Sequence, residues 1–199
     1  GECMVLLEND GSLPLKPFQR KIALYGNGAR HTIKGGTGSG DVNTRYSVSI
    51  YEGLKNAGFE ISTEPWLDAF DNLVKQSVID YNNFLESQAK KMGVPPMVVG
   101  MGHPYKQPDC QLVTEQDVIQ SASDTAVYVL SRNSGEGCDR YAEKGDYYLS
   151  DTEKANLEFL RNQYKTLILI LNIGGIIDAP SIKAIKASSV LLAGQLGNT

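Results

Sequence analysis

Short hydrophobic runs alternate with amphipathic stripes along most of the chain. Five runs are rich in β-branched and aromatic residues and predict strands at 21–26, 59–63, 125–132, 166–174 and 189–194. The fourth run is hydrophobic without alternation, which is typical of a strand that is buried on both faces. These strands form the predicted centre of the fold.

Helical periodicity fills most of the intervals between these strands. Helices are predicted at 42–57, 64–92, 114–123, 149–164 and 179–188. Asp41 is the expected N-cap of the first helix, and Gly58 is its expected stop. Ser150 and Glu153 have the spacing of a capping box, in which each side chain accepts a main-chain N–H of the other residue.

The order of these elements predicts an α/β fold. Alternating strands and helices indicate a three-layer αβα sandwich with a mostly parallel sheet of about five to six strands. Four of the eight prolines fall in 93–112, which predicts an irregular excursion over the surface. Leu6 and Leu7 are expected to be the tail of a helix begun upstream. Residues 1–199 are expected to be one domain of a longer protein, since the chain stops soon after a strand that is predicted to be buried.

Composition narrows the classes of function. A chain that is 41% hydrophobic and 21% charged is typical of a soluble globular protein. A net charge of -4, with no basic run longer than two residues, argues against nucleic-acid binding. No apolar stretch reaches the roughly 18–20 residues that span a membrane.

The cysteines and histidines indicate neither a disulfide framework nor a metal site. The three cysteines are widely separated and form no CxxC pair, so three free thiols are expected. The two histidines have no HxxxH or HExxH spacing. Free cysteines and the lack of a signal-peptide pattern favour a cytoplasmic location, but the chain opens on Gly1 and not on Met, so its start does not decide this.

A glycine-rich loop over 26–41 is the first candidate for chemistry, because parallel sheets present functional loops at the carboxyl ends of their strands. The pattern GxGxxG fails at His31. The pattern GxxxxGK[ST] fails because Asp41 and Val42 replace the lysine and the hydroxyl residue that grip phosphate and magnesium. A turn that passes close to a neighbouring domain or a polyhydroxyl ligand is therefore favoured over a nucleotide site.

A second loop, over 131–148, holds Glu136 between two glycines. Glycines on both sides free the backbone and remove bulk, so such a loop can put a carboxylate into a narrow pocket. On residue chemistry alone, a salt bridge from Glu136 to Arg132 or Arg140 on a solvated loop is the favoured alternative. Asp139 and Arg140 are expected to form a local pair that stiffens the loop.

Six motifs in order carry a family resemblance: MVLLENDGSLPL, KIALYGNGA, KGGTGSGDVN, SRNSGEGCDR, KGDYYLSDTE and LILILNIGG. Together they resemble glycoside hydrolase family 3, the β-glucosidase and β-xylosidase family, in its α/β-sandwich or C-terminal domain. The resemblance runs from Met4 to Gln195, and the stretch 78–112 differs most from the family pattern. KGGTGSGDVN is most similar to the branch in which the sandwich can precede the barrel.

The resemblance implies a domain of a retaining, exo-acting β-glycosidase that needs no cofactor. A (β/α)8 barrel of the same polypeptide would supply the nucleophilic aspartate and most of the subsite for a β-linked glucoside or related oligosaccharide. The sandwich would lend the acid/base carboxylate, Glu136, and the isolated fragment would be inactive. Residues expected to border the substrate or the domain interface are Lys34, Gly35, Gly36, Ser39, Asp41, Arg45 and Ser134.

Two other classes stay open on the residues. The first is a non-catalytic carbohydrate-binding or scaffolding α/β domain in which Glu136 is structural. Tight binding of glucose or cellobiose to the isolated chain would favour it, because in the enzyme most sugar contacts belong to the barrel. The second is a nucleotide-binding domain, which predicts stabilisation by ATP or NAD.

Overall fold

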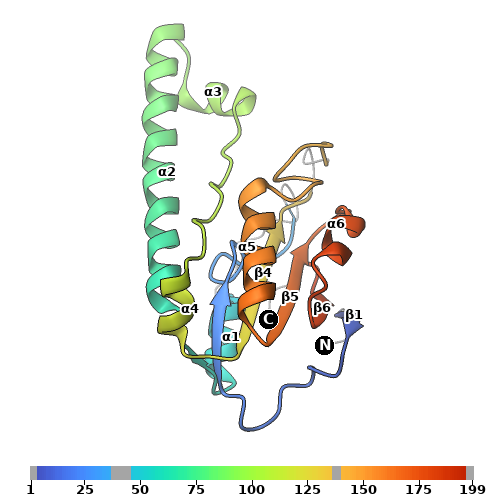
Figure 1. The fold of residues 1–199 in the computed structure, drawn as a ribbon. Helices are drawn as coiled ribbons and strands as arrows, with labels where there is room; N and C mark the ends of the chain where they lie inside the picture. The colour runs from blue at the N-terminus through green and yellow to red at the C-terminus, as the bar shows by residue number, and fades with distance from the viewer. Residues whose placement is uncertain (1–3, 37–45, 136–139, 196–199) are drawn as a thin grey trace.

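A computed structural model describes residues 4–36, 46–135 and 140–195, and a six-stranded sheet lies at its centre. The strands are β1 (Val5–Asn9), β2 (Lys21–Tyr25), β3 (Glu60–Ile61), β4 (Thr125–Arg132), β5 (Thr166–Ile173) and β6 (Ser189–Leu192). Their order across the sheet is β1-β6-β5-β4-β2-β3 (Figure 1). β1 pairs antiparallel with β6, and the other pairings are parallel. The predicted mostly parallel sheet is confirmed.

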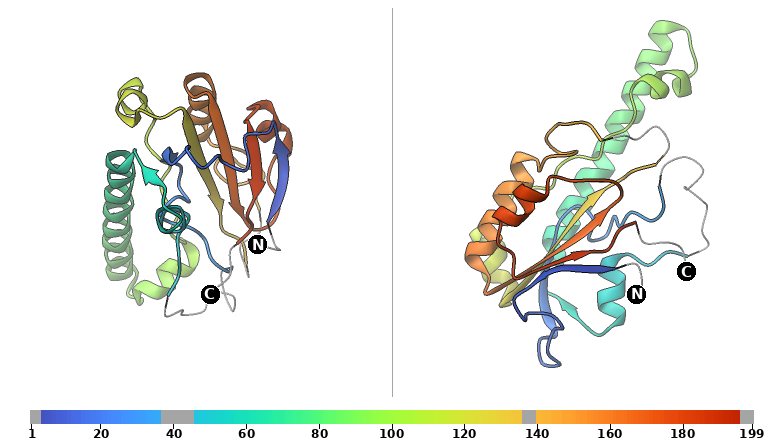
Figure 2. Two further views of the ribbon diagram at one scale, coloured as in Figure 1. Left: turned by 90° about the horizontal axis from the view of Figure 1, so that it is seen from below. Right: turned by 90° about the vertical axis from the view of Figure 1, so that its right-hand side faces the viewer.

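Helices lie on both sides of this sheet. They are α1 (Ile50–Asn56), α2 (Glu64–Met92), α3 (Pro96–Gly102), α4 (Glu115–Ser121), α5 (Asp151–Gln163) and α6 (Ala179–Ala184). α5 and α6 cover one side of the sheet, and α1 lies on the other (Figure 2). The arrangement is the α/β sandwich that the sequence predicts.

The core forms around the central strands. All eight residues of β4 are buried. Leu157 and Leu160 of α5 are fully buried. On the side of β2, Trp66 from the first turn of α2 packs edge-on against Tyr25, with 5.1 Å between the ring centroids. This packing holds the carboxyl ends of the strands in fixed positions, where the functional loops begin.

The predicted helix over 42–57 is wrong at its start. Residues 46–49 are not helical, and α1 begins at Ile50. Ser49 and Glu52 form a capping box, which satisfies the first free N–H groups of the helix at this point. Tyr46, which lies inside the predicted helix, is 59% exposed. Asp41 lies outside the described residues and is not the N-cap of this helix.

The prediction that Leu6 and Leu7 end a helix is also wrong. They belong to β1, where Leu6 pairs with Leu191 of β6. The edge of β6 offers main-chain N–H and C=O groups that need hydrogen-bond partners, and β1 provides them. Because the short run around Leu6 has no clear periodicity of its own, this pairing decides its conformation.

The predicted strand over 59–63 forms only at Glu60–Ile61. Thr63 ends it by bonding to β2 through its side chain. Its hydroxyl donates to the Leu24 carbonyl at 2.7 Å and accepts from the Leu24 N–H at 2.8 Å. The hydroxyl thus makes the contacts that a longer β3 would make through its backbone.

The long predicted helix is confirmed as α2, and its buried residues are concentrated in its first part, with Ala89 the exception near its end. Trp66, Leu67 and Phe70 are buried, whereas Leu73 is 41% exposed and Val78 is 38% exposed. The second half of α2 extends beyond the sheet with α3 beside it (Figure 1). Within the described ranges, no helix combines the length and apolarity needed to cross a membrane.

The irregular excursion predicted over 93–112 is wrong at Pro96–Gly102, which form α3. Pro95 is extended and Pro96 begins the helix. Proline is favoured in a first helical turn, because the N–H it lacks has no intrahelical partner there. The cluster of prolines therefore starts a helix as well as breaking one.

Candidate functional site

The carboxyl ends of β2, β4, β5 and β6 meet at one edge of the sheet. Arg132 at the end of β4 pairs with Ile173 at the end of β5, and Leu171 pairs with Leu192 at the end of β6. The loops that follow these strands therefore start side by side. Functional loops of parallel sheets lie at this edge, and both predicted loops begin here.

The loop after β2 lies directly on β4. Gly26 has φ +97°, and a Cβ on Gly26 or Gly28 would overlap atoms of Val129 or Ser131. Asn27, between them, accepts from the Ser131 N–H at 2.8 Å and donates to the Ser131 carbonyl at 3.1 Å. The two glycines of KIALYGNGA thus serve the close approach of this loop to β4 of the same sheet, whereas the sequence favoured an approach to a neighbouring domain or a polyhydroxyl ligand.

Asn172, near the end of β5, joins β4 to the loops after β2 and β6. Its side chain is fully buried, and its Oδ1 accepts from the Ser131 hydroxyl and from the Ile33 N–H, both at 2.7 Å. Its Nδ2 donates to the Ile33 carbonyl at 2.9 Å and to the Gly194 carbonyl at 2.7 Å. A buried amide with this full set of partners fixes the loops after β2 and β6 relative to each other.

Arg30 anchors the loop after β2 to α2. Its guanidinium bonds to Glu64 at 2.6 Å, to Asp68 at 2.6 Å and to Asp71 at 2.8 Å. Burial by itself would lower the pKa of Arg30, but the carboxylates of Asp68 and Asp71 raise it above its usual value. His31 also contacts Asp71, at 2.8 Å. The loop is therefore held both at the sheet edge and on α2.

Arg132 forms a buried ion pair with Glu153 below the second loop. Its Nη1 and Nη2 bond to the two carboxylate oxygens at 2.7 and 2.5 Å, and both side chains are about 95% buried. Its Nε donates to the Asp146 carbonyl at 3.0 Å. Glu153 also accepts from the Ser150 N–H at 2.8 Å, as its predicted capping box requires. One ion pair therefore ties β4, α5 and the loop between them together.

The first stem of the second loop, 133–135, packs against the glycine-rich loop. A Cβ on Gly36 would lie 2.5 Å from the Ser134 carbonyl oxygen and 3.2 Å from the Gly135 Cα. A Cβ on Gly174, after β5, would overlap the Ser134 hydroxyl. Ser134 thus fits between two glycines from two other loops.

The second stem begins at Arg140, which is bound to the same place. Arg140 donates to the Gly174 carbonyl at 2.6 Å and to Asp146 at 2.7 Å. Burial by itself would raise the pKa of Asp146, but the Tyr141 N–H and the Arg140 charge lower it below its usual value. Both stems of the segment 136–139 are therefore fixed at Gly174.

Four of the predicted site residues are described, and four lie outside the described residues. Gly36 and Ser134 are brought together by direct packing. Lys34 and Gly35 lie in the same segment, directly after Ile33, whose main chain Asn172 holds. Those outside the described residues are Glu136, Ser39, Asp41 and Arg45.

The two arginines suggested as partners for Glu136 have other partners. Arg132 is paired with Glu153, and Arg140 is paired with Asp146. Asp139, the expected partner of Arg140, lies outside the described residues, so that local pairing stays untested. Asp146 and Glu153 were not predicted as partners, because they lie outside SRNSGEGCDR, the motif that contains both arginines.

The cysteine and metal-ligand side chains of the described residues provide no further site. Cys110 is a free, buried thiol, as expected, and burial raises its pKa above the usual range, so it is not a nucleophile at neutral pH. Cys3 and Cys138 lie outside the described residues. Among the described residues, no group of three or more His, Cys, Asp or Glu side chains is arranged to hold a metal ion.

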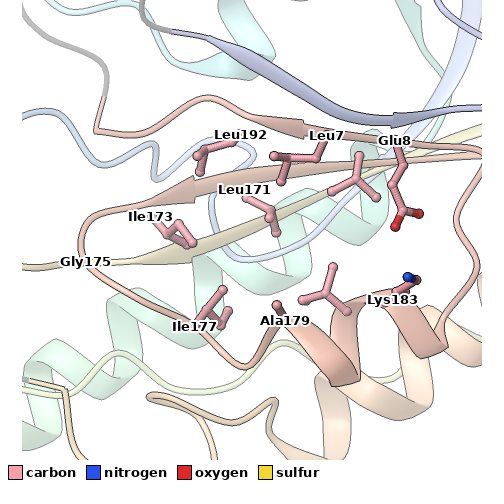
Figure 3. Close-up of a pocket in the computed structure, with 11 residues that line it drawn as sticks. Leu7, Glu8, Leu171, Ile173, Gly175, Ile177, Ala179, Lys183 and Leu192 are labelled. Carbon is pink, nitrogen blue, oxygen red and sulfur yellow. The ribbon is translucent and has the colours of Figure 1, made fainter.

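A separate pocket of about 300 Å³ lies between α6 and the strands β1, β6 and β5, at the β1 end of the sheet (Figure 3). Its walls are mainly aliphatic, from residues such as Leu7, Leu171 and Ile177. Glu8 and Lys183 are the two charged residues among its lining, and their side chains point toward one another at one end of the pocket (Figure 3). A single carboxylate beside an ammonium group does not provide the carboxyl pair that glycoside hydrolysis needs.

We expect Gly36→Ala to destabilise the chain by about 1–3 kcal/mol, because a new methyl group would be forced against the backbone of 134–135. Urea unfolding measures this loss. Gly102→Ala is the matched control, since a Cβ there meets nothing within 4 Å. An equal effect of both substitutions would contradict the close packing of the two loops.

Comparison with known proteins gives a consistent match. A family model for the glycosyl hydrolase family 3 C-terminal domain matches residues 4–199. β-Glucosidase A of Butyrivibrio fibrisolvens is 31% identical over 223 residues, which cover 98% of this chain and 24% of that protein. A β-glucosidase of Ruminococcus albus is 31% identical over 202 residues, which cover 100% of this chain and 19% of that protein.

Solved structures agree with this match. The structure of β-glucosidase 3B from Thermotoga neapolitana in complex with glucose aligns with a TM-score of 0.74 and 33% identity, covering 98% of this chain and 26% of that one. A β-glucosidase from Paenibacillus barengoltzii has the same fold, with a TM-score of 0.74 and 23% identity. The chain spans about a quarter or less of the length of these similar proteins.

Proposed function

Because the chain belongs to the glycosyl hydrolase family 3 C-terminal domain family, we propose that it is the sandwich domain of a retaining, exo-acting β-glycosidase that cleaves β-linked glucosides. In this proposal Glu136 is the general acid/base. A (β/α)8 barrel of the same polypeptide supplies the nucleophile and most of the sugar subsite. The observation that supports it best is that both stems of the segment 136–139 are fixed at Gly174, on the carboxyl edge of the sheet.

The proposed reaction needs two carboxyl groups about 5–5.5 Å apart. The barrel carboxylate attacks the anomeric carbon while Glu136 gives its proton to the leaving oxygen. Glu136, now ionised, then takes a proton from the water that attacks the glycosyl-enzyme. A carboxyl group in this role works best with a pKa raised toward about 6, and a nearby carboxylate and an enclosed site both raise it.

Such a raised pKa would require that the neighbouring arginines have carboxylate partners of their own. An unpaired arginine beside Glu136 would stabilise its ionised form and lower its pKa. Arg132 and Arg140 are instead neutralised by Glu153 and Asp146. The charges of both arginines are therefore already compensated without a carboxylate from the segment 136–139.

The glycine-rich loop would form part of the rim of the site. Gly36 and Ser134 pack together where the two loops meet, and Lys34 and Gly35 precede them in the chain. We propose that these residues, with Ser39, Asp41 and Arg45, border the sugar or the interface with the barrel. Hydroxyl, amide and charged donors in such positions suit the hydroxyl groups of a glucoside.

The proposal is tested by the stereochemistry of the product made by the full-length protein. We expect hydrolysis of an aryl β-glucoside to release β-glucose first, which proton NMR detects before mutarotation. The 199-residue chain alone is expected to release no glucose, because it supplies only one of the two carboxyl groups.

Two results would contradict the proposal. Release of α-glucose first would mean inversion, and full-rate turnover by the isolated chain would mean that no barrel is needed. Tight binding of glucose or cellobiose to the isolated chain, combined with an inactive full-length protein, would support a binding or scaffolding domain instead.

A further inference from the structure

We propose that Gln195 is a positioning residue that holds the first stem of the loop carrying Glu136, an inference that rests on the proposed function. Gln195 follows β6, and its amide reaches across to the loop after β4. Its Nε2 donates to Asn133 Oδ1 at 3.1 Å and to the Ser134 carbonyl at 3.2 Å. Its Oε1 faces the Ser134 hydroxyl at 3.3 Å. One side chain thus contacts both residues that precede Gly135 and Glu136.

Gly174 provides the space in which this contact forms. A Cβ at this position would lie 2.5 Å from Gln195 Oε1 and would overlap the Ser134 hydroxyl. The Gly174 N–H donates to the Arg132 carbonyl at 3.1 Å, and the Gly174 carbonyl accepts from Arg140 at 2.6 Å. Gln195 therefore holds the first stem at the residue where Arg140 holds the second.

The backbone before Gln195 is itself fixed, so the amide starts from a defined place. The Ala193 N–H donates to the Leu171 carbonyl at 2.9 Å. The Gly194 carbonyl accepts from Asn172 at 2.7 Å, and Gly194 has φ +66°, which favours glycine. The fully buried Asn172 is thus linked through Gly194 and Gln195 to the stem of the loop.

The pattern of donors and acceptors requires an amide at this position. Gln195 donates to two oxygens and offers an oxygen to a hydroxyl group, and an amide can do both. A glutamate would have only acceptor oxygens, and it would place a negative charge against the Ser134 carbonyl and the Asn133 amide oxygen. A leucine would keep most of the volume and lose all three polar contacts.

The full-length enzyme tests this role with two substrates. We expect Gln195→Leu and Gln195→Glu to lower kcat/KM for cellobiose by about 10- to 100-fold, since a misplaced catalytic group can cost about 100-fold. For 2,4-dinitrophenyl β-glucoside, whose leaving group needs no proton, we expect kcat/KM to change less than threefold. Gln195→Asn keeps the amide on a side chain that is one methylene shorter. Its kcat/KM for cellobiose is expected to lie between those of the wild type and the leucine variant.

Gln76→Leu is the matched control, because Gln76 is exposed on α2 and bonds only to Asp80 among the described residues. We expect Gln76→Leu to leave kcat/KM unchanged for both substrates. If Gln195 had a merely structural role, its variants would lower kcat/KM equally for both substrates, because less enzyme would be folded. That result would overturn the proposal. Unchanged kcat/KM of the Gln195 variants for both substrates would also overturn the proposal. If Gln195→Leu is not obtained folded, as judged by circular dichroism, Gln195→Glu decides the question by the same ratio.

Failure of this inference can be told apart from failure of the proposed function by assaying Glu136→Ala on the same two substrates. If Glu136→Ala lowers kcat/KM far more for cellobiose than for the dinitrophenyl substrate, and the Gln195 variants show no such difference, only the positioning role is refuted. No substrate difference for Glu136→Ala refutes the acid/base role, and with it the basis for assigning Gln195.

Discussion

In the full-length enzyme, Glu136→Ala is expected to slow the cleavage of glucosides with poor leaving groups by about 10²–10⁴-fold, which is the usual contribution of a general acid. An alkyl alcohol or a second sugar leaves slowly unless its oxygen is protonated as the bond breaks. A 2,4-dinitrophenolate leaves as a stable anion, so kcat/KM for that substrate should fall far less. The ratio of the two kcat/KM values measures the effect.

Azide provides a second measure of the same residue. In Glu136→Ala the glycosyl-enzyme is expected to accumulate, because no base activates the attacking water. Azide is anionic and needs no base, so added azide should raise kcat for the dinitrophenyl substrate and yield β-glucosyl azide, which mass spectrometry identifies. Glu143→Ala, which removes an exposed glutamate from the same loop, is the control and should show neither effect. Equal losses on both substrates without azide rescue would assign the acid role to another residue.

Signals confined to a few neighbouring residues predicted most of the fold. The run at 125–132 became β4, and that at 166–174 became β5 with a loss of one residue. Ser150 and Glu153 formed the predicted capping box. The same kind of signal was present at Ser49 and Glu52, where a capping box marks the true start of α1. The spacing of Ser49 and Glu52 thus indicated the correct start of α1, whereas the helical periodicity over 42–57 placed that start too early.

Features that depend on distant contacts could not be predicted in this way. β1 is a strand because β6 offers it an edge, and nothing within Val5–Asn9 specifies that partner. Gln195 meets Ser134 across 61 positions of the chain, so neither residue carries a local sign of the contact. Gly174 looked like the end of a strand, and its lack of a side chain matters only because two other loops pack there.

The ion pair of Arg132 and Glu153 combines a local signal, which the sequence shows, with a contact between distant residues, which it does not. The sequence identified Glu153 as a helix cap and Arg132 as a possible partner for Glu136. The structure joins Arg132 and Glu153 to each other and buries both. Because Arg132 is the last residue of β4, this pair sets where the loop with Glu136 begins, and its loss should affect stability more than any other single exchange discussed for this chain.

Arg132→Met is expected to destabilise the 199-residue chain by about 3–5 kcal/mol, because it leaves the Glu153 carboxylate buried without its cation. Urea unfolding of the chain measures this loss. Lys144→Met breaks a pair of the same kind, Lys144 with Asp151 at 2.7 Å, whose side chains are 67% and 82% exposed. That control should cost no more than about 1 kcal/mol, because water already solvates both charges.

The double variant Arg132→Met/Glu153→Gln separates the pair's interaction from the cost of an unpaired charge. Removing both charges leaves no buried ion, and a glutamine oxygen can still accept from the Ser150 N–H at the helix start. We therefore expect the double variant to be more stable than Arg132→Met alone, with a coupling energy of about 1–3 kcal/mol. If the two changes simply add, or if Arg132→Met costs no more than Lys144→Met, then the packing of β4 and α5 holds the base of the loop and the ion pair does not.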